Sequence, residues 1–139
     1  MIYLAAFVSL YVQYPGLLGH NGILPADSFL SRVMFESDKS FFDFPSLLFY
    51  ASRWGIPVDC MSDFLLLWGS SSSLLLIGGM THPFLLLSCW LSYLSVFLVG
   101  QTFLSFQWDI LLLEVSFVTF ECAIKYIYTS KLFIHIILY

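Results

Sequence analysis

The polar residues that could do chemistry in this chain are concentrated between two long apolar runs. The stretch is residues 100–114, and its candidate residues are Gln101, Gln107, Trp108, Asp109 and Glu114. In hydrocarbon an ionisable side chain costs roughly 2.5–3.5 kcal/mol, so a carboxylate at such a depth is a candidate functional site. The two carboxylates would act as an acid–base pair only if a substrate entered between them. We therefore interpret these five residues as candidates for structural or partner contacts rather than as a catalytic set.

A purely structural role competes with a direct functional contact at both carboxylates. Asp109 directly precedes an apolar helical run, where it would be the N-cap and accept hydrogen bonds from free backbone N–H groups. Glu114 lies five residues further on, about 7.5 Å along the helix. At that depth its carboxylate can still reach the lipid headgroups. The residues alone leave both interpretations open.

The composition is that of a membrane protein. Of the 139 residues, 60% are hydrophobic and 10% are charged, compared with about 45–50% and about 25% in soluble domains. The apolar residues form long uninterrupted runs, which a soluble core of this size does not need. The net charge of −4 gives no basic face for nucleic acid, so we expect membrane lipids and not nucleic acid as partners.

Motifs for enzymatic chemistry are absent from the sequence. There is no nucleophile elbow, phosphate loop, dinucleotide fingerprint or zinc-protease motif. The three cysteines, Cys60, Cys89 and Cys122, are far apart and give neither a disulfide framework nor a zinc-binding spacing. The three histidines have no acidic residue placed beside them in sequence. We therefore expect no catalytic residues, no cofactor and no metal site.

The apolar runs predict an all-α bundle with about four membrane helices. The first run is shorter than the about 20 residues that a span needs, so it is interpreted as a truncated helix that stops at Pro15. Residues 64–108 carry no charged side chain, and the turn at 78–83 divides them into a hairpin of two spans. In the last span Glu121 lies near mid-membrane and Lys125 at i+4 is its expected partner. The expected helices are residues 2–14, 62–77, 84–104 and 110–128.

The first loop, residues 15–61, is the one sizeable aqueous segment of the sequence. After Pro25, apolar residues recur at helical spacing. These residues are Phe29, Leu30, Val33 and Met34. Pro45 suits the first turn of a second helix. We expect two short interfacial helices that lie along the membrane surface.

Small residues on the two middle spans favour close helix packing. The first span carries Gly69 and serines at 70–73, and the second carries Ser88, Ser92 and Ser95. Such residues let helix backbones approach closely and form hydrogen bonds without water. A transport or lipid-binding bundle is the alternative interpretation, and it requires a wet cavity among these serines.

Several stretches of the sequence resemble the N-terminal membrane region of the lipase maturation factors. In collinear order they are residues 2–7, 9–17, 22–26, 45–48, 93–95, 99–101 and 106–114. The Phe-Gln-Trp-Asp segment at 106–109 resembles the second member of that family more than the first. The resemblance divides the chain into residues 1–114, the N-terminal transmembrane region, and residues 115–139, the end of the fourth span and a divergent tail. Val115-Ser116 replaces the family's threonine-glycine, and from Glu121 onward the residues show no likeness to the family.

The resemblance implies a multi-pass protein of the endoplasmic reticulum membrane. Such proteins assist the folding, assembly and export of secreted lipases of the lipoprotein lipase type and have no established catalytic activity. The family continues into a large lumenal domain thought to engage the lipase, so this chain is expected to be a fragment, a truncated isoform or a gene model that reads into unrelated sequence. A distant likeness to the membrane region of vitamin K-dependent carboxylase makes a membrane-embedded enzyme the alternative.

Overall fold

The structure is a computed structural model that describes residues 1–36, 45–80 and 82–138. Every regular element in these ranges is a helix, which confirms the predicted all-α class. The helices are α1 (Ile2–Leu17), α2 (Ala26–Glu36), α3 (Leu47–Arg53), α4 (Val58–Ile77), α5 (Pro83–Val99), α6 (Gln101–Leu104) and α7 (Gln107–Leu138).

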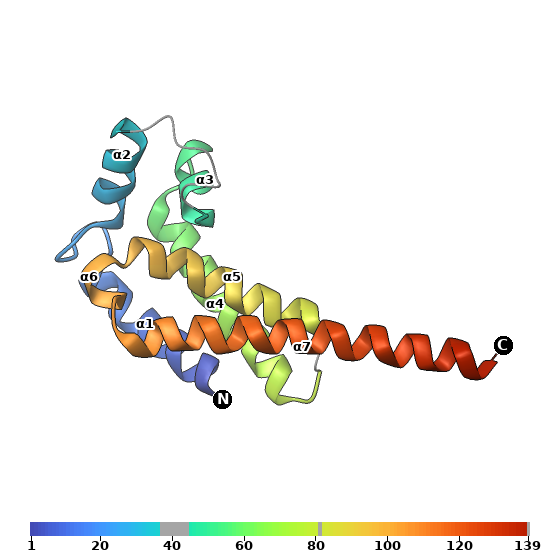
Figure 1. Ribbon diagram of the computed structural model, residues 1–139. Coiled ribbons are helices and arrows are strands. Elements are labelled where there is room, and N and C mark those ends of the chain that lie inside the picture. Colours follow the sequence, from blue (N-terminus) through green and yellow to red (C-terminus); the bar gives the residue numbers. More distant parts are fainter. Residues whose placement is uncertain (37–44, 81, 139) are drawn as a thin grey trace.

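The helices form a bundle around the α4–α5 hairpin. Helix α1 packs on α4, and α7 packs on α5. Helices α2 and α3 lie together at one end of the bundle, and the second half of α7 extends well beyond the other helices (Figure 1). The predicted hairpin with its turn at 78–83 is confirmed, as are the two short helices in the first loop. Pro45 lies two residues before α3, not in its first turn.

Helix α1 continues past the proline that was expected to stop it. It ends at Leu17, with Pro15 inside its last turn. A proline lacks one backbone N–H, but the residues after it still have theirs. The N–H of Leu18 donates to the Tyr14 carbonyl at 2.9 Å. The missing bond at Pro15 therefore does not end the helix.

The second span of the hairpin is shorter than predicted because the chain bends at a glycine. Helix α5 ends at Val99, and after Gly100 the single turn of α6 runs in a new direction. A Cβ on Gly100 would lie 2.2 Å from Cδ1 of Leu104, so a larger residue would not fit in this bend. The apolar pattern continues through residue 104 and gives no sign of this bend.

Membrane-spanning character is clearest in α4. Among the described helices, α4 alone is long and apolar enough to cross a membrane, whereas α1 and α5 are apolar but have 16 and 17 residues. Helix α7 has 32 residues but carries charged residues at positions 109, 114, 121, 125 and 131. The expected number of about four spans therefore stays a prediction.

The bundle core is centred where α1, α4 and α5 meet. Phe7 of α1 is fully buried, and its ring lies so close to α4 that a Cβ on Gly69 would lie 2.3 Å from the ring Cζ atom. The same ring makes an edge-to-face contact with Tyr93 of α5, with the centroids 5.5 Å apart. The close approach predicted for the small residues is confirmed at Gly69.

The buried serines form hydrogen bonds within and between helices. The Ser88 hydroxyl of α5 donates to the Ser72 hydroxyl of α4 at 3.3 Å. At the end of the bundle that carries α3, the Ser46 hydroxyl donates to the Ser95 carbonyl at 3.0 Å, and the Leu47 N–H donates to the Ser95 hydroxyl at 3.1 Å. In the described part of the chain every buried side-chain nitrogen or oxygen has a hydrogen-bond partner. These serines therefore stabilise helix packing.

A buried hydrogen bond between α1 and α4 gives a first prediction. The hydroxyl groups of Tyr14 and Ser62 lie 2.6 Å apart, and Ser62 also donates to the Val58 carbonyl at 2.8 Å. Tyr14→Phe is expected to lower the free energy of unfolding by about 1 kcal/mol, because one buried hydrogen bond is lost. Reversible unfolding in detergent micelles measures this change. Tyr11→Phe, at an exposed position of the same helix, is the control, and equal stability of the two variants would contradict the prediction.

Candidate functional site

The candidate residues lie where α6 leads into α7, and the start of α7 corrects one prediction. Helix α7 begins at Gln107, not at Ile110, so Asp109 lies in its first turn and is not the N-cap. The Asp109 N–H donates to the Phe106 carbonyl at 3.1 Å. The first N–H groups of a helix lack intrahelical partners, and the positive helix end favours acids, so polar residues fit the first turn well. The apolar pattern therefore starts later than the helix.

Asp109 is connected to the core through a tyrosine of the neighbouring helix. Its Oδ1 atom accepts a hydrogen bond from the Tyr93 hydroxyl at 2.5 Å. The Tyr93 side chain is buried, with 2% exposed, and its ring contacts the rings of Phe7 and Tyr3. A hydrogen bond to an ionised carboxylate is roughly twice as strong as one between neutral groups. The Asp109 side chain therefore anchors the start of α7 to α5.

Three other candidates lie on the opposite side of α7. Gln107, Trp108 and Glu114 are all exposed, and the indole of Trp108 is 80% exposed. Together with Ile110 and Leu111 they line a shallow hollow of about 410 Å³. We call these five residues the outer face of α7. The structure thus brings three of the candidates together and separates them from Asp109.

Gln101 is the first residue of α6, and its side chain is not among those that the structure describes. Its predicted role as a contact residue stays a prediction.

The two carboxylates of the motif do not form a pair. Five residues correspond to a rotation of about 140° around a helix axis. Accordingly, Asp109 contacts Tyr93 of α5 while Glu114 belongs to the outer face of α7. Among the residues that the structure describes, no group of three or more His, Cys, Asp or Glu side chains is placed to hold a metal ion. This arrangement does not support acid–base chemistry at the motif.

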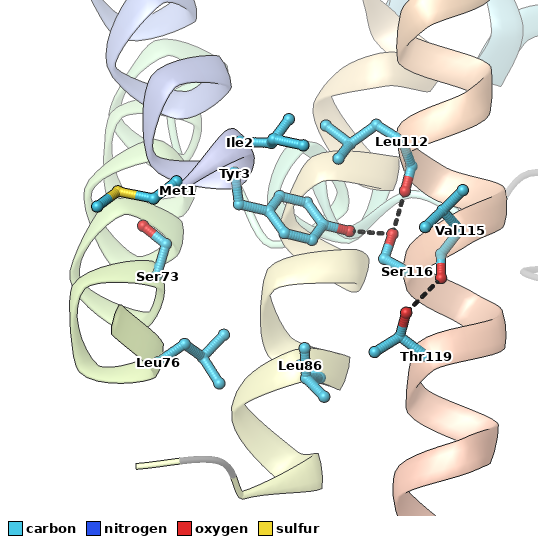
Figure 2. A pocket seen from close by; sticks show the side chains of 10 residues that line it. All are labelled: Met1, Ile2, Tyr3, Ser73, Leu76, Leu86, Leu112, Val115, Ser116 and Thr119. Atoms are coloured by element: carbon cyan, nitrogen blue, oxygen red, sulfur yellow. Dashed lines mark hydrogen bonds between the residues drawn. The ribbon is translucent and has the colours of Figure 1, made fainter. Parts of the chain in front are cut away.

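The side of α7 that faces the bundle makes further polar contacts that the sequence did not reveal. The Trp90 indole N–H donates to the Leu113 carbonyl at 3.0 Å. The hydroxyl of Tyr3 in α1 donates to the hydroxyl of Ser116 in α7 at 2.5 Å, and these two residues are 113 positions apart in the sequence (Figure 2). A tyrosine or tryptophan in an apolar run needs a polar partner when it is buried. That requirement was the signal available in the sequence, although it does not identify the partner.

A larger cavity lies beside the Tyr3–Ser116 contact. It has a volume of about 530 Å³, is open on one side and is lined by residues of α1, α4, α5 and α7 and by Met1, with mostly apolar walls (Figure 2). Its lining residues are Met1, Ile2, Tyr3, Ser73, Leu76, Leu86, Leu112, Val115, Ser116 and Thr119. No carboxylate, imidazole or basic side chain is among them. The titratable side chain among these lining residues is Tyr3, whose hydroxyl already donates to Ser116.

Glu121 and Lys125 are on α7 beyond the bundle contacts. Their charged atoms lie 4.0 Å apart at the predicted i,i+4 spacing. The prediction that they pair is confirmed. Both side chains are more than half exposed, so the pair is not part of the bundle core.

The fold and the motif together define a helical membrane domain whose polar residues hold helices together. The family model described as "Lipase maturation factor transmembrane domain" matches residues 1–131. The chain belongs to the lipase maturation factor family. The matched range extends beyond Glu121, where inspection of the residues gave no further likeness. The proposed division of the chain at residue 114 stays a prediction.

Known relatives agree with this family and with the expected subgroup. The chain is 45% identical over 127 residues to "Lipase maturation factor 2" of Xenopus laevis, covering 88% of this chain and 18% of that protein. It is 44% identical over 124 residues to the Mus musculus protein of the same name, with the same coverage. "Lipase maturation factor 1" of Bos taurus is more distant, at 31% over 121 residues, covering 84% of this chain and 21% of that protein. No solved structure matches the chain.

The chain spans less than a fifth of the length of the factor 2 relatives described above. The function of these relatives as whole proteins therefore involves much more sequence than the part that aligns with this chain.

Proposed function

We propose that this chain forms part of the membrane domain of a lipase maturation factor, resident in the endoplasmic reticulum membrane with several spans. In this role it assists the folding and export of secreted lipases of the lipoprotein lipase type. The observation that carries the proposal is the match of residues 1–131 to the family's transmembrane domain, supported by 42–45% identity to relatives named lipase maturation factor 2.

The contacts of the bundle support a scaffolding role for this region. Phe7 against Gly69, and Tyr93 with Asp109, hold α1, α4, α5 and α7 in one arrangement. Large apolar side chains are exposed on the outside of α4, among them Phe64, Leu67 and Trp68. An exposed apolar surface of this kind suits membrane lipids, which are the expected partners here. We assign contact with the lipase to parts of the longer protein outside this chain.

The structure gives no specific support to the two alternative functions. A carboxylase-like enzyme would use Asp109 and Glu114 together, but these side chains lie on different sides of α7. The relatives are named as maturation factors and not as enzymes. A transport or lipid-binding bundle would need a wet cavity among the serines. The cavity of about 530 Å³ has Ser73 and Ser116 in its walls, but these walls are mostly apolar, and Ser72, Ser88 and Ser95 are hydrogen-bonded in helix contacts.

A chimera tests the proposed function. The stretch of the Xenopus laevis relative that aligns with this chain over 127 residues is replaced by the aligned part of this chain. The chimera is expressed in cells that lack the factor, together with a lipoprotein lipase. We expect secreted lipase activity to return to at least about half of the level given by the intact relative, because the helix contacts of the domain are retained. The measurement is lipase activity in the medium, normalised to chimera abundance.

Two controls make the chimera informative. A relative with the aligned stretch deleted should give no secretion above that of the empty cells. The chain expressed alone shows whether this region suffices. A chimera that is as abundant as the intact relative but restores no activity would overturn the proposed function.

A further inference from the structure

The cavity beside the Tyr3–Ser116 contact is large enough to hold a molecule, and the proposed function gives it no role. Its volume is about 530 Å³. An apolar protein cavity of about 150 Å³ holds one benzene molecule, or about 25 Å³ for each carbon atom, so this cavity has room for about 20 carbon atoms. Ser73 and Leu76 of α4, the helix that is long and apolar enough to cross a membrane, form one wall. The cavity therefore lies in the part of the domain that we place in the bilayer.

The hydroxyl groups in the cavity walls already donate to other atoms of the protein. Tyr3 donates to Ser116, and Ser116 donates to the Leu112 carbonyl (Figure 2). Thr119 and Ser73 each donate to a carbonyl of their own helix at 2.7 Å. None of the lining side chains is charged. A ligand that needs an ion-pair partner or a free hydrogen-bond donor, such as a phosphate or a charged peptide, finds neither among these side chains.

The size of the cavity distinguishes between a helix and a flexible chain as its occupant. One turn of an α-helix with its side chains is about 10–12 Å wide and about 5.4 Å high, and it fills about 500 Å³. A further span of a longer protein needs about 20 residues, so it cannot enter the cavity and at most covers the open side. A hydrocarbon chain of about 16–18 carbon atoms fits the volume. An unfilled apolar cavity forfeits the van der Waals contacts of its walls, which such a chain restores.

We propose that this cavity binds the hydrocarbon chain of a lipid, which enters through the open side and packs between α1, α4, α5 and α7. The bound chain is a resident part of the bundle, in contrast to the cargo of a transport bundle with a wet cavity. The inference goes beyond the lipase role and does not rest on it, so either can fail without the other.

Photocrosslinking tests the inference. The complete 139-residue chain in detergent micelles receives increasing amounts of phosphatidylcholine that carries a diazirine on one acyl chain. A second series uses palmitic acid that carries a diazirine, which distinguishes a phospholipid tail from a free fatty acid. Mass spectrometry identifies the crosslinked residues.

A chain bound in the cavity and lipid that only covers the surface give different titrations. We expect crosslinking at Leu86 and Leu112 in the cavity walls to saturate at about one chain per protein, the number for which the volume has room. Crosslinking at Leu67 and Trp68, which are exposed on the outside of α4, should rise in proportion to the amount of probe. Proportional crosslinking at all four residues would overturn the proposal.

Two variants of α7 assign the saturable crosslinking to the cavity. Thr119→Trp places a large ring at the open side and should weaken saturable binding at least about fivefold, which corresponds to about 1 kcal/mol. Val118→Trp, at a neighbouring position that is 58% exposed and does not line the cavity, should retain it. Both positions are exposed, so both variants are expected to fold, and circular dichroism checks this. Unchanged saturation in a folded Thr119→Trp variant would contradict the proposal.

The chimera described above distinguishes a lipid chain from the rest of the longer protein as the occupant. In the chimera every part of the Xenopus laevis relative outside the aligned stretch is present. We expect saturable crosslinking at Leu86 in the chimera as in the chain alone. If the chimera lost this crosslinking while the chain alone retained it, the rest of the longer protein would fill or close the cavity, and the proposal would be wrong.

Discussion

Gly69→Leu is expected to separate α1 from α4 and to give the largest loss of stability of any single change in the bundle. A Cβ atom alone would lie 2.3 Å from the ring of Phe7, which is fully buried. Overpacking of a core commonly costs about 1–3 kcal/mol, and a leucine adds three further carbon atoms at this contact. We expect a loss of at least about 3 kcal/mol, measured by reversible unfolding in detergent micelles and by abundance in membranes.

The control for this change is a glycine in the same bundle with open space around it. No atom lies within 4 Å of the position that a Cβ would take at Gly16 of α1. Gly16→Leu should therefore cost far less than Gly69→Leu. Combining Gly69→Leu with Phe7→Ala should recover part of the loss, because the ring that causes the clash is removed. If both leucine variants unfolded at the same denaturant concentration, the proposed contact between Phe7 and α4 would be wrong.

The second large effect concerns the bond between Asp109 and Tyr93. Asp109→Ala leaves the buried Tyr93 hydroxyl without its acceptor, which costs about 1–3 kcal/mol. In a double-mutant cycle with Tyr93→Phe, we expect a coupling energy of about 1.5–3 kcal/mol, the range for hydrogen bonds to charged groups. Reversible unfolding of the two single variants and the double variant measures it.

The matched control for this cycle pairs Asp109→Ala with Tyr126→Phe, since Tyr126 lies on the same helix and is 76% exposed. This pair should be additive within about 0.5 kcal/mol. Additive effects at Tyr93 would mean that the bond does not stabilise the start of α7. Asp109→Asn also separates structure from catalysis, because a structural carboxylate lowers abundance and a catalytic one lowers turnover at unchanged abundance.

The helices were largely predictable from the sequence because apolar runs and turn residues act locally. The long uncharged run and the turn at 78–83 predicted the α4–α5 hairpin, and the spacing of apolar residues after Pro25 predicted α2. The ends of helices were less predictable. The chain bends at Gly100 within an apolar run. Helix α7 begins with Gln107, Trp108 and Asp109, which precede the apolar run from which its start was predicted.

The candidate site was predictable in its residues but not in its contacts. Asp109 stood out because carboxylates are rare between apolar runs, and in the structure its carboxylate accepts a hydrogen bond from Tyr93. Its partner Tyr93 was not identified, because periodicity predicts which residues share a face and not which helix covers that face. The same limit applies to Tyr3 and Ser116, which are brought together only by the packing of α1 near α7.

The length of α7 has a consequence for how this domain sits in a bilayer. Its 32 residues extend about 48 Å, whereas the hydrocarbon layer is about 30 Å thick. Trp108 and Tyr128, which are 80% and 73% exposed, are separated by about 30 Å along the axis, and such rings favour the two water interfaces. We therefore expect a span between Trp108 and Tyr128, in which the two rings would oppose sliding along the membrane normal.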